Sequence, residues 1–182
     1  MTQTMLRPRI LRKPLTQEQI GLLLKVSDPE WPGLIRIGLY GGGRLGEAAA
    51  LTWDKVNMEG GTIRLPGRRF DAPMPPELLA FFASLDKPAA PGAPVFPTCF
   101  KMALEHPSML SARFRRLLSQ AGVAPVGFHH LRITFVFALQ RVGLSSRTAA
   151  RLVGYSTNYG FEHVPMESTY LKQVLSKLYQ AQ

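Results

Sequence analysis

The chain has 182 residues, of which 22 are Lys or Arg and 12 are Asp or Glu, so its formal net charge is +10. This length is sufficient for one domain with a buried core, and the charge favours nucleic acid as a partner over an ordinary basic surface. The single cysteine, Cys99, excludes a disulfide framework and a Cys-rich zinc site. Without a membrane span or a secretory signal in the pattern, we expect a cytoplasmic, nucleoid-associated protein.

The N-terminal half contains a basic arm, three expected helices and three short strands. Residues 1–14 form the arm, which is either disordered or lies on a phosphate backbone. Thr16 and Gln19 match a capping box and predict a helix start, and residues 31–39 fit a second helix. The glycine run at 41–43 ends that helix, and a third begins at Arg44. Strands are expected at Val56, 62–65 and 72–74, separated by turns at 59–61 and 66–69.

The C-terminal half is expected to be helical. Helices are predicted at 75–85, at 108–120, from Phe128, at 145–153 and at 167–179, and a Pro/Ala-rich loop covers 87–97. The helix at 108–120 is basic and carries Arg113, Arg115 and Arg116. The predicted class is therefore α+β, mainly α-helical with a small three-stranded antiparallel sheet, in one domain that spans residues 15–182.

The helix that begins at Phe128 combines polar and apolar residues in an unusual way. His129 and Arg132 lie about 60° apart on one face of a helix with 3.6 residues per turn. The rest of the circumference is so apolar that we predict a largely buried helix. A buried arginine stays charged and needs an anion. Arg132 therefore requires a carboxylate or a phosphate, and the net charge of the chain favours phosphate.

The glycine run allows two interpretations. Residues 41–46 match the pattern G-x-G-x-x-G, but a dinucleotide fold also needs a preceding strand and further parallel strands. The segment before the run has helical spacing instead. In the second interpretation the glycines end one helix and place Arg44 at the start of the next, where free N–H groups favour an anion. Glu47, three residues later, can orient the Arg44 guanidinium.

Six features occur in one order along the chain: Gly43-Arg44-Leu45-Gly46-Glu47, Leu51-Thr52-Trp53, three small strands, His129-x-Leu131-Arg132, Val153-Gly154-Tyr155-Ser156 and Thr169-Tyr170. Their order, their spacing and the elements between them resemble the catalytic domain of tyrosine recombinases, the phage-integrase family. The resemblance covers residues 15–179 approximately, and the two arginine motifs carry it together. It implies the tyrosine recombinase catalytic-domain fold.

The resemblance also implies a site-specific recombinase or integrase that breaks and rejoins DNA. Arg44 and Arg132 would clamp the scissile phosphate, and Glu47 would support Arg44. His129 would act in proton transfer or phosphate binding. Tyr170 would attack phosphorus, giving a 3′-phosphotyrosyl link and a free 5′-hydroxyl without a metal or a high-energy cofactor.

The partner implied is double-stranded DNA, bound by a homotetramer on two duplexes, with no membrane involved. The basic helix, through Arg113, Arg115 and Arg116, and the turn at 66–69 are the expected DNA contacts. A metal site formed by His129, His130 and His163 is not expected, because the adjacent His129 and His130 project about 100° apart on a helix.

The sequence departs from the family pattern in three ways, and the first two predict slow chemistry or a lost activity. The turn between the second and third strands carries Arg68 and Arg69 where the family usually has a lysine that protonates the leaving oxygen. A guanidinium stays protonated and is a poor proton donor, although it bonds DNA well. Tyr155 stands where His or Trp is usual, and the N-terminal core-binding domain is expected to be absent. The alternative hypotheses are a catalytically impaired relative that occupies recombination sites and a dinucleotide-binding oxidoreductase.

Overall fold

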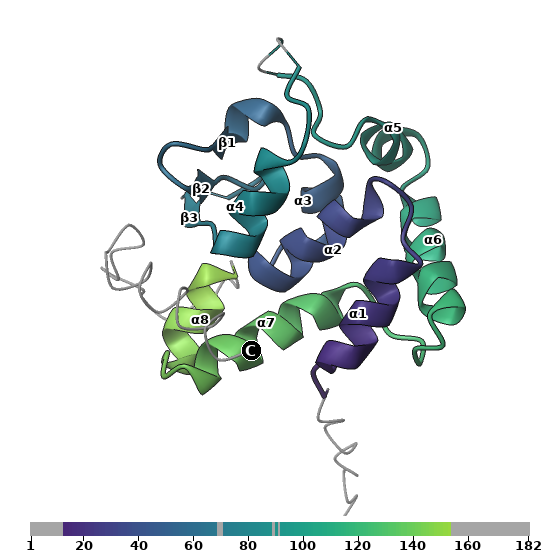
Figure 1. Ribbon diagram of the computed structural model, residues 1–182, viewed down its shortest axis with the longest axis vertical. Helices are drawn as coiled ribbons and strands as arrows, with labels where there is room; N and C mark the ends of the chain where they lie inside the picture. The colour runs from purple at the N-terminus through teal and green to yellow at the C-terminus, as the bar shows by residue number, and fades with distance from the viewer. Residues whose placement is uncertain (1–12, 69–70, 89, 91, 154–182) are drawn as a thin grey trace, which may run out of the picture.

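A buried helix, α2 (Trp31–Tyr40), lies at the centre of the fold (Figure 1). The computed structural model describes residues 13–68, 71–88, 90 and 92–153. Two glycines of α2 allow close packing on both of its sides. A Cβ atom at Gly33 would lie 2.3 Å from the Phe96 ring, and one at Gly38 would lie 3.0 Å from Leu131. Any larger residue at Gly33 or Gly38 would therefore push these partners away.

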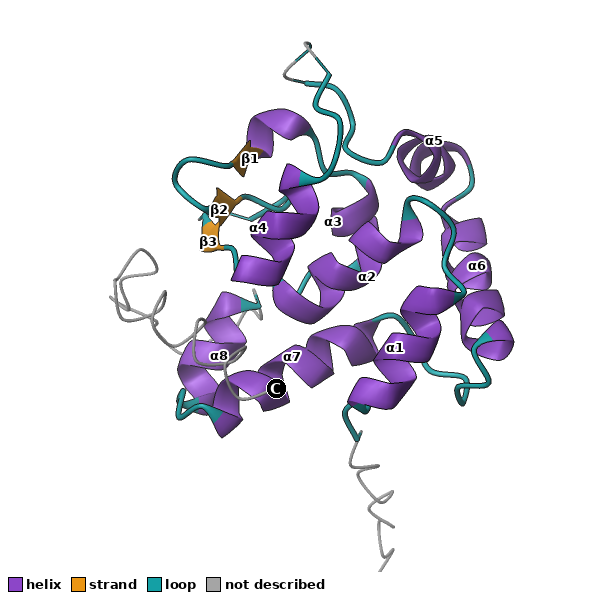
Figure 2. Ribbon diagram, viewed as in Figure 1, coloured by secondary structure: helices purple, strands orange, loops and turns teal. Residues whose placement is uncertain are grey.

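The other helices surround α2, and a small sheet lies at one edge (Figure 2). The helices are α1 (Gln17–Lys25), α3 (Leu45–Ala49), the 3-10 helix η1 (Trp53–Lys55), α4 (Pro76–Ala83), α5 (Pro97–Glu105), α6 (Pro107–Gln120), α7 (His129–Arg141) and α8 (Ser146–Leu152). The strands are β1 (Val56–Asn57), β2 (Thr62–Ile63) and β3 (Ala72–Pro73). They pair antiparallel in the order β1-β2-β3, with Val56 opposite Ile63 and Ile63 opposite Ala72.

The predicted class is confirmed within the described residues: the fold is mainly helical with a three-stranded antiparallel sheet. The capping box of α1 is present, since Gln19 N–H donates to Thr16 Oγ1 at 3.2 Å and Thr16 N–H donates to Gln19 Oε1 at 3.0 Å. Strands β2 and β3 are shorter than expected, and β1 lies at the expected position. Helix α5 was not predicted: its first residue, Pro97, fell in the expected loop, and no element was assigned to the rest of it. The predicted last helix at 167–179 lies outside the described residues.

Two apolar clusters form the core. The larger one joins α1 to α6 and the start of α7, and the smaller one joins the second half of α7 to α8. Helix α7 is less buried than its composition predicted. Leu131, Phe135 and Leu139 are buried along one face, whereas Phe137 is 41% exposed. Phe137 therefore lies outside the core, whereas Val136 and Ala138 are partly buried and pack against the smaller cluster.

No helix in the described part of the chain is long and apolar enough to cross a membrane.

Candidate active site

A tight glycine turn follows α2 and provides the backbone carbonyls of the site. Gly41 caps α2, and the N–H groups of Gly41 and Gly43 both donate to the Ile37 carbonyl at 3.0 Å. Gly42 has φ +58°, in the left-handed region that favours glycine. A Cβ atom there would lie 2.4 Å from Val153 Cγ1. The turn follows a helix, and the sheet is antiparallel, so the context required for dinucleotide binding is missing from the described chain.

Arg44 is the N-cap residue of α3, directly after this turn. Glu47 Oε2 accepts from the Arg44 backbone N–H at 2.9 Å, and Glu47 Oε1 accepts from Arg44 Nη1 at 3.2 Å. The Arg44 side chain is 62% exposed, and that of Glu47 is 13% exposed. Glu47 therefore anchors one side of the Arg44 guanidinium, as predicted from the spacing, while most of the side chain faces solvent.

Arg68, in the turn between β2 and β3, points into the protein. Its side chain is 5% exposed, and Nη2 donates to Glu47 Oε2 and to the Gly42 carbonyl, both at 2.8 Å. Nη1 donates to the carbonyls of Gly41 at 3.3 Å and of Leu152 at 3.2 Å. We expected Arg68 to contact DNA. In this position all four bonds of its two terminal nitrogens go to protein oxygens.

Arg132 reaches the same turn from α7. Arg132 is 2% exposed, as the apolar pattern predicted. Its Nη1 donates to the Gly42 carbonyl at 3.0 Å. Gly42 O thus accepts from two guanidiniums, those of Arg68 and Arg132. We use the term arginine network for Arg44, Glu47, Arg68 and Arg132 together with the Gly41 and Gly42 carbonyls. The structure brings the two predicted clamp arginines into one connected set of hydrogen bonds.

His129 begins α7, three residues before Arg132, and is exposed. Its ring lies over Gly127, where a Cβ atom would be 2.6 Å from His129 Nδ1. The His130 ring is 4.6 Å from it, centroid to centroid, at 49°. Within the described residues, no group of three or more His, Cys, Asp or Glu side chains is arranged to hold a metal ion.

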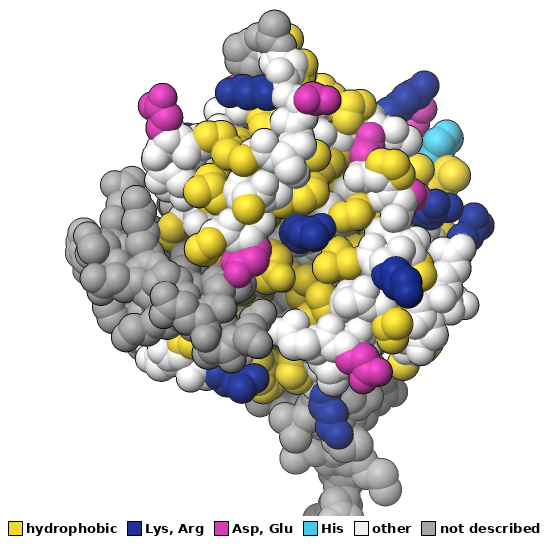
Figure 3. All heavy atoms as spheres, in the orientation of Figure 1, with side chains coloured by type: hydrophobic (Ala, Val, Ile, Leu, Met, Phe, Trp, Pro, Cys, Tyr) yellow, Lys and Arg dark blue, Asp and Glu magenta, His cyan; other side chains and the backbone are white. Residues whose placement is uncertain are grey.

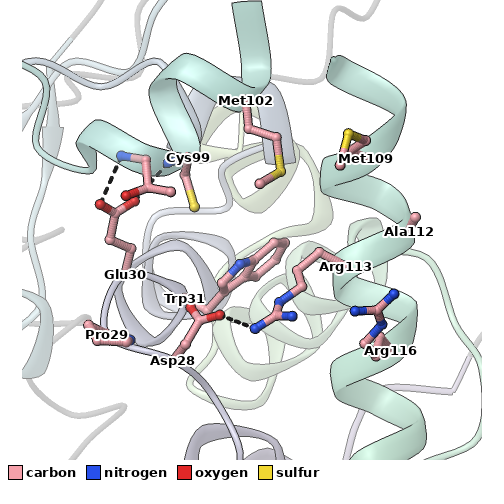
Figure 4. A pocket seen from close by; sticks show the side chains of 11 residues that line it. Asp28, Pro29, Glu30, Trp31, Cys99, Met102, Met109, Ala112, Arg113 and Arg116 are labelled. Carbon is pink, nitrogen blue, oxygen red and sulfur yellow. Dashed lines mark hydrogen bonds and ion pairs between the residues drawn. The ribbon is translucent and has the colours of Figure 1, made fainter. Parts of the chain in front are cut away.

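The three arginines of α6 face two different cavities. Arg113 and Arg116 line a cavity of about 540 Å³ between α5, α6 and the start of α2, where Arg113 pairs with Asp28 (Figure 4). Arg115 lines a second cavity of about 390 Å³ with Leu45 and Phe128. These two residues are chain neighbours of Arg44 and His129. Arg115 is therefore placed beside the candidate active site, whereas Arg113 and Arg116 lie on another surface of α6.

One residue that lines the larger cavity, Glu30, stabilises the start of α5. Glu30 caps the N-terminus of α5, because its carboxylate accepts from the backbone N–H groups of Thr98 at 2.9 Å and Cys99 at 2.7 Å (Figure 4). Burial, and then the adjacent Glu30 carboxylate, raise the pKa of the Cys99 thiol to about 12. Cys99 is accordingly an unreactive core thiol. The sequence indicated only that it is the single cysteine, not that it is buried.

Some predicted residues fall outside the described part of the chain. Arg69, Tyr155 and Tyr170 are in this group, so their places relative to the arginine network stay predictions. On the face shown in Figure 3, described Lys and Arg side chains are scattered among apolar and uncharged atoms. The positive charge is not gathered into one patch on that face.

The sequence matches the model of the phage integrase family over residues 13–159. The chain belongs to this family. No curated protein sequence is significantly similar to it. Two solved structures share the fold of this family member: an integrase from mycobacterium phage Brujita, with a TM-score of 0.60, and XerA recombinase, with a TM-score of 0.58. Sequence identity is 18% in both cases, so the likeness shows the fold, that of tyrosine recombinase catalytic domains, and confirms the predicted one.

The chain is shorter than both of these proteins. The similarity to the Brujita phage integrase covers 81% of this chain and 51% of that one, and the similarity to XerA recombinase covers 92% of this chain and 64% of that one. This family member therefore spans between about half and two thirds of the proteins it resembles.

Proposed function

We propose that this chain is the catalytic domain of a site-specific DNA recombinase that cuts and rejoins strands through a 3′-phosphotyrosyl intermediate. The observation that carries the proposal is the arginine network. Arg44 and Arg132 are 88 residues apart in sequence, yet Glu47, Arg68 and the Gly42 carbonyl connect them through hydrogen bonds of 2.8–3.2 Å. Family membership supplies the reaction type, and the network supplies a site suited to a phosphate.

The network suits a phosphodiester because its donors are held before the ligand arrives. Donors that are fixed in advance stabilise developing negative charge without reorganisation. Glu47 holds Arg44 on one side only, and the 62% exposed side chain leaves the other side open to a ligand. His129 is exposed one turn before Arg132. A phosphate bound by Arg44 would therefore approach the N-terminal end of α7.

The chemistry assigned to the chain balances as a transesterification. A bond forms between the Tyr170 oxygen and phosphorus, and the bond from phosphorus to the 5′-oxygen of the next nucleotide breaks. The tyrosine proton leaves to His129 or to water, and the 5′-oxygen takes up a proton to become a hydroxyl. Attack by a 5′-hydroxyl from the partner duplex reverses the step, so no metal or high-energy cofactor is needed. In this proposal, Tyr155 bonds a phosphate oxygen.

The contacts with the duplex are assigned to arginines of helix α6 and of the β2–β3 turn. Arg115, beside the candidate active site, and Arg69 are proposed to bind the DNA backbone. Arg113 and Arg116 remain proposed contacts for a part of the duplex that reaches the other side of α6. Recombination between two duplexes needs four copies of the site, so we propose a homotetramer on DNA.

The decisive experiment is trapping of the covalent intermediate. Duplexes with a randomised centre are enriched by binding to the full chain, and the recovered site is nicked so that the short strand released by cleavage diffuses away. A covalent adduct on a denaturing gel, mapped to a peptide that contains Tyr170, is the expected result. Tyr170→Phe should eliminate it, and Tyr179→Phe is the matched control that should keep it.

A persistent adduct in Tyr170→Phe, mapped to Tyr155 or Tyr159, would overturn the assignment of the nucleophile. A second function, a catalytically impaired DNA-binding relative, is favoured by one observation. The turn that usually provides a lysine to the leaving group provides Arg68, whose guanidinium bonds protein oxygens. Tight DNA binding without any adduct would select this second function.

A further inference from the structure

We infer that Arg68 is a positioning residue: it fixes the guanidiniums of Arg44 and Arg132, and it does not protonate the leaving group. This inference deepens the proposed function and rests on it. The residue lies in the β2–β3 turn, where the resemblance placed a DNA contact. Its hydrogen bonds to protein oxygens support a different role.

The first argument is the set of acceptors that Arg68 reaches. Its two terminal nitrogens bond four oxygens on three segments: the glycine turn, Glu47 of α3 and the end of α8. A guanidinium has a planar fork that can bond several acceptors in fixed directions, whereas a lysine has one terminal nitrogen. No lysine could hold all four oxygens in this arrangement. Arg68 is thus matched to the site it occupies.

The second argument is that both clamp arginines depend on acceptors that Arg68 also holds. Glu47 Oε2 accepts from Arg68 Nη2 at 2.8 Å and from the Arg44 backbone N–H at 2.9 Å. The Gly42 carbonyl accepts from Arg68 at 2.8 Å and from Arg132 at 3.0 Å. Loss of the Arg68 guanidinium would leave a mostly buried Glu47 carboxylate with one cation instead of two. The carboxylate and the glycine turn would then shift, and both clamp arginines would move with them.

The third argument concerns the C-terminal segment. Arg68 Nη1 donates to the carbonyl of Leu152, the last residue of α8. The chain that follows α8 carries Tyr155 and Tyr170. Arg68 therefore holds the end of α8, where that segment begins, in addition to the clamp arginines. One side chain connects the sheet, the clamp and the start of the segment with the proposed nucleophile.

The experiment compares Arg68→Met with Arg64→Met in the full chain. Arg64 belongs to the same hairpin, but its side chain is 50% exposed and pairs with Asp71. Single-turnover cleavage is measured per folded molecule on two duplexes with the same sequence, one ordinary and one with sulfur in place of the 5′-bridging oxygen. Sulfur is a leaving group that needs no acid. A misplaced clamp slows both substrates, whereas a lost proton donor slows only the ordinary one.

We expect Arg68→Met to slow cleavage of both duplexes by the same factor, about 100-fold, with DNA affinity within about twofold of the parent. Arg64→Met should cleave at the parent rate. Where Arg68→Met folds poorly, Arg68→Lys takes its place, and it should also slow both substrates equally because one ammonium cannot hold four acceptors. Recovery of the parent rate on the sulfur substrate by either variant would overturn the inference, as would parent rates on both substrates.

A second measurement does not depend on activity. The side-chain Nε–H signal of Arg132, assigned by its loss in Arg132→Lys, is recorded in protein with ¹⁵N-labelled arginine. We expect this signal to move in Arg68→Met and to stay in place in Arg64→Met. An unmoved signal would contradict the positioning role even in an active enzyme. If the signal moves in Arg68→Met although the parent protein cleaves neither duplex, the positioning role stands and the proposed function is refuted.

Discussion

Gly42→Ala tests whether the glycine turn limits the stability of the fold and the geometry of the site. Gly42 has φ +58°, and a left-handed backbone costs a residue with a Cβ atom roughly 1–2 kcal/mol. The new methyl group would also lie 2.4 Å from Val153 Cγ1 and 3.2 Å from Phe135 Cδ1. Overpacking of this kind costs about 1–3 kcal/mol. We therefore expect the free energy of unfolding in urea to fall by about 2–5 kcal/mol.

Gly46→Ala is the matched control for this measurement. Gly46 lies within α3, and nothing comes within 4 Å of its Cβ position. An alanine there should stabilise the helix by roughly 0.5–1 kcal/mol. Adding Val153→Ala to Gly42→Ala should recover the steric part of the loss and leave the backbone part, which a double-mutant cycle separates. A loss below about 0.5 kcal/mol in Gly42→Ala, or no coupling to Val153, would refute the reasoning.

Three further outcomes are expected. Arg44→Ala should lower the cleavage rate by about 10²–10³-fold while leaving most of the DNA affinity, because the clamp acts on charge that develops in the transition state; equal losses in rate and affinity would contradict this. The log–log slope of DNA affinity against salt should be roughly −5, corresponding to about five or six phosphate contacts, and a slope near zero would leave the charge of +10 unexplained. The raised pKa of Cys99, about 12 against 9.0, means that the folded state holds the thiol proton more tightly than the unfolded state. Its contribution to stability is complete below about pH 9 and is lost as the pH rises toward 12, so Cys99→Ala should lose less stability than the parent over this range, as measured by urea unfolding.

The elements that could be predicted from the sequence are those whose signals are local. The start of α1 follows from Thr16 and Gln19, which satisfy each other's backbone within one helical turn. The hairpins follow from Gly61 and Gly67, whose φ angles are +61° and +79°. Arg44 and Glu47 form their pair across three residues of one helix. Each of these features needs only neighbours in the chain.

Helix α5 could not be predicted because the group that caps it is remote in sequence. Glu30, at the start of α2, accepts from Thr98 and Cys99, 68 and 69 residues later. Without this carboxylate, the segment after Pro97 has only a proline at its start and no polar capping residue of its own. The exposure of Phe137 was missed for a related reason. An apolar composition indicates which faces of a helix can be buried, but the neighbouring elements decide which faces are covered.

For the candidate site, too, the sequence indicated which residues take part but not how their side chains are oriented. The sequence led us to expect Arg44, Glu47 and Arg132 at one site, and hydrogen bonds connect these three residues through Arg68 and Gly42. The buried state of Arg132 followed from the apolar residues around it. The direction of Arg68 did not follow, because its acceptors lie 21 to 84 residues away and three of the four are backbone carbonyls. Every residue has a backbone carbonyl, so the residue type does not reveal which carbonyl will accept a bond. A turn arginine that faces DNA and one that faces inward look alike in sequence.

The two clamp arginines differ in exposure and are therefore held in place in different ways. Arg132 is 2% exposed and is held by a carbonyl, so its position is set by the core. Arg44 is 62% exposed and is held by a carboxylate at one side of its guanidinium. A bond between two ionised groups adds an ion-pair attraction that a bond to a neutral carbonyl lacks, and an exposed arginine without such a bond would sample many rotamers. Glu47 thus restrains the arginine that the core cannot restrain, and Arg68 restrains Glu47 in turn. The position of the exposed Arg44, where a phosphate would bind, thus depends on Glu47, then on Arg68, and finally on the buried glycine turn that Arg68 contacts.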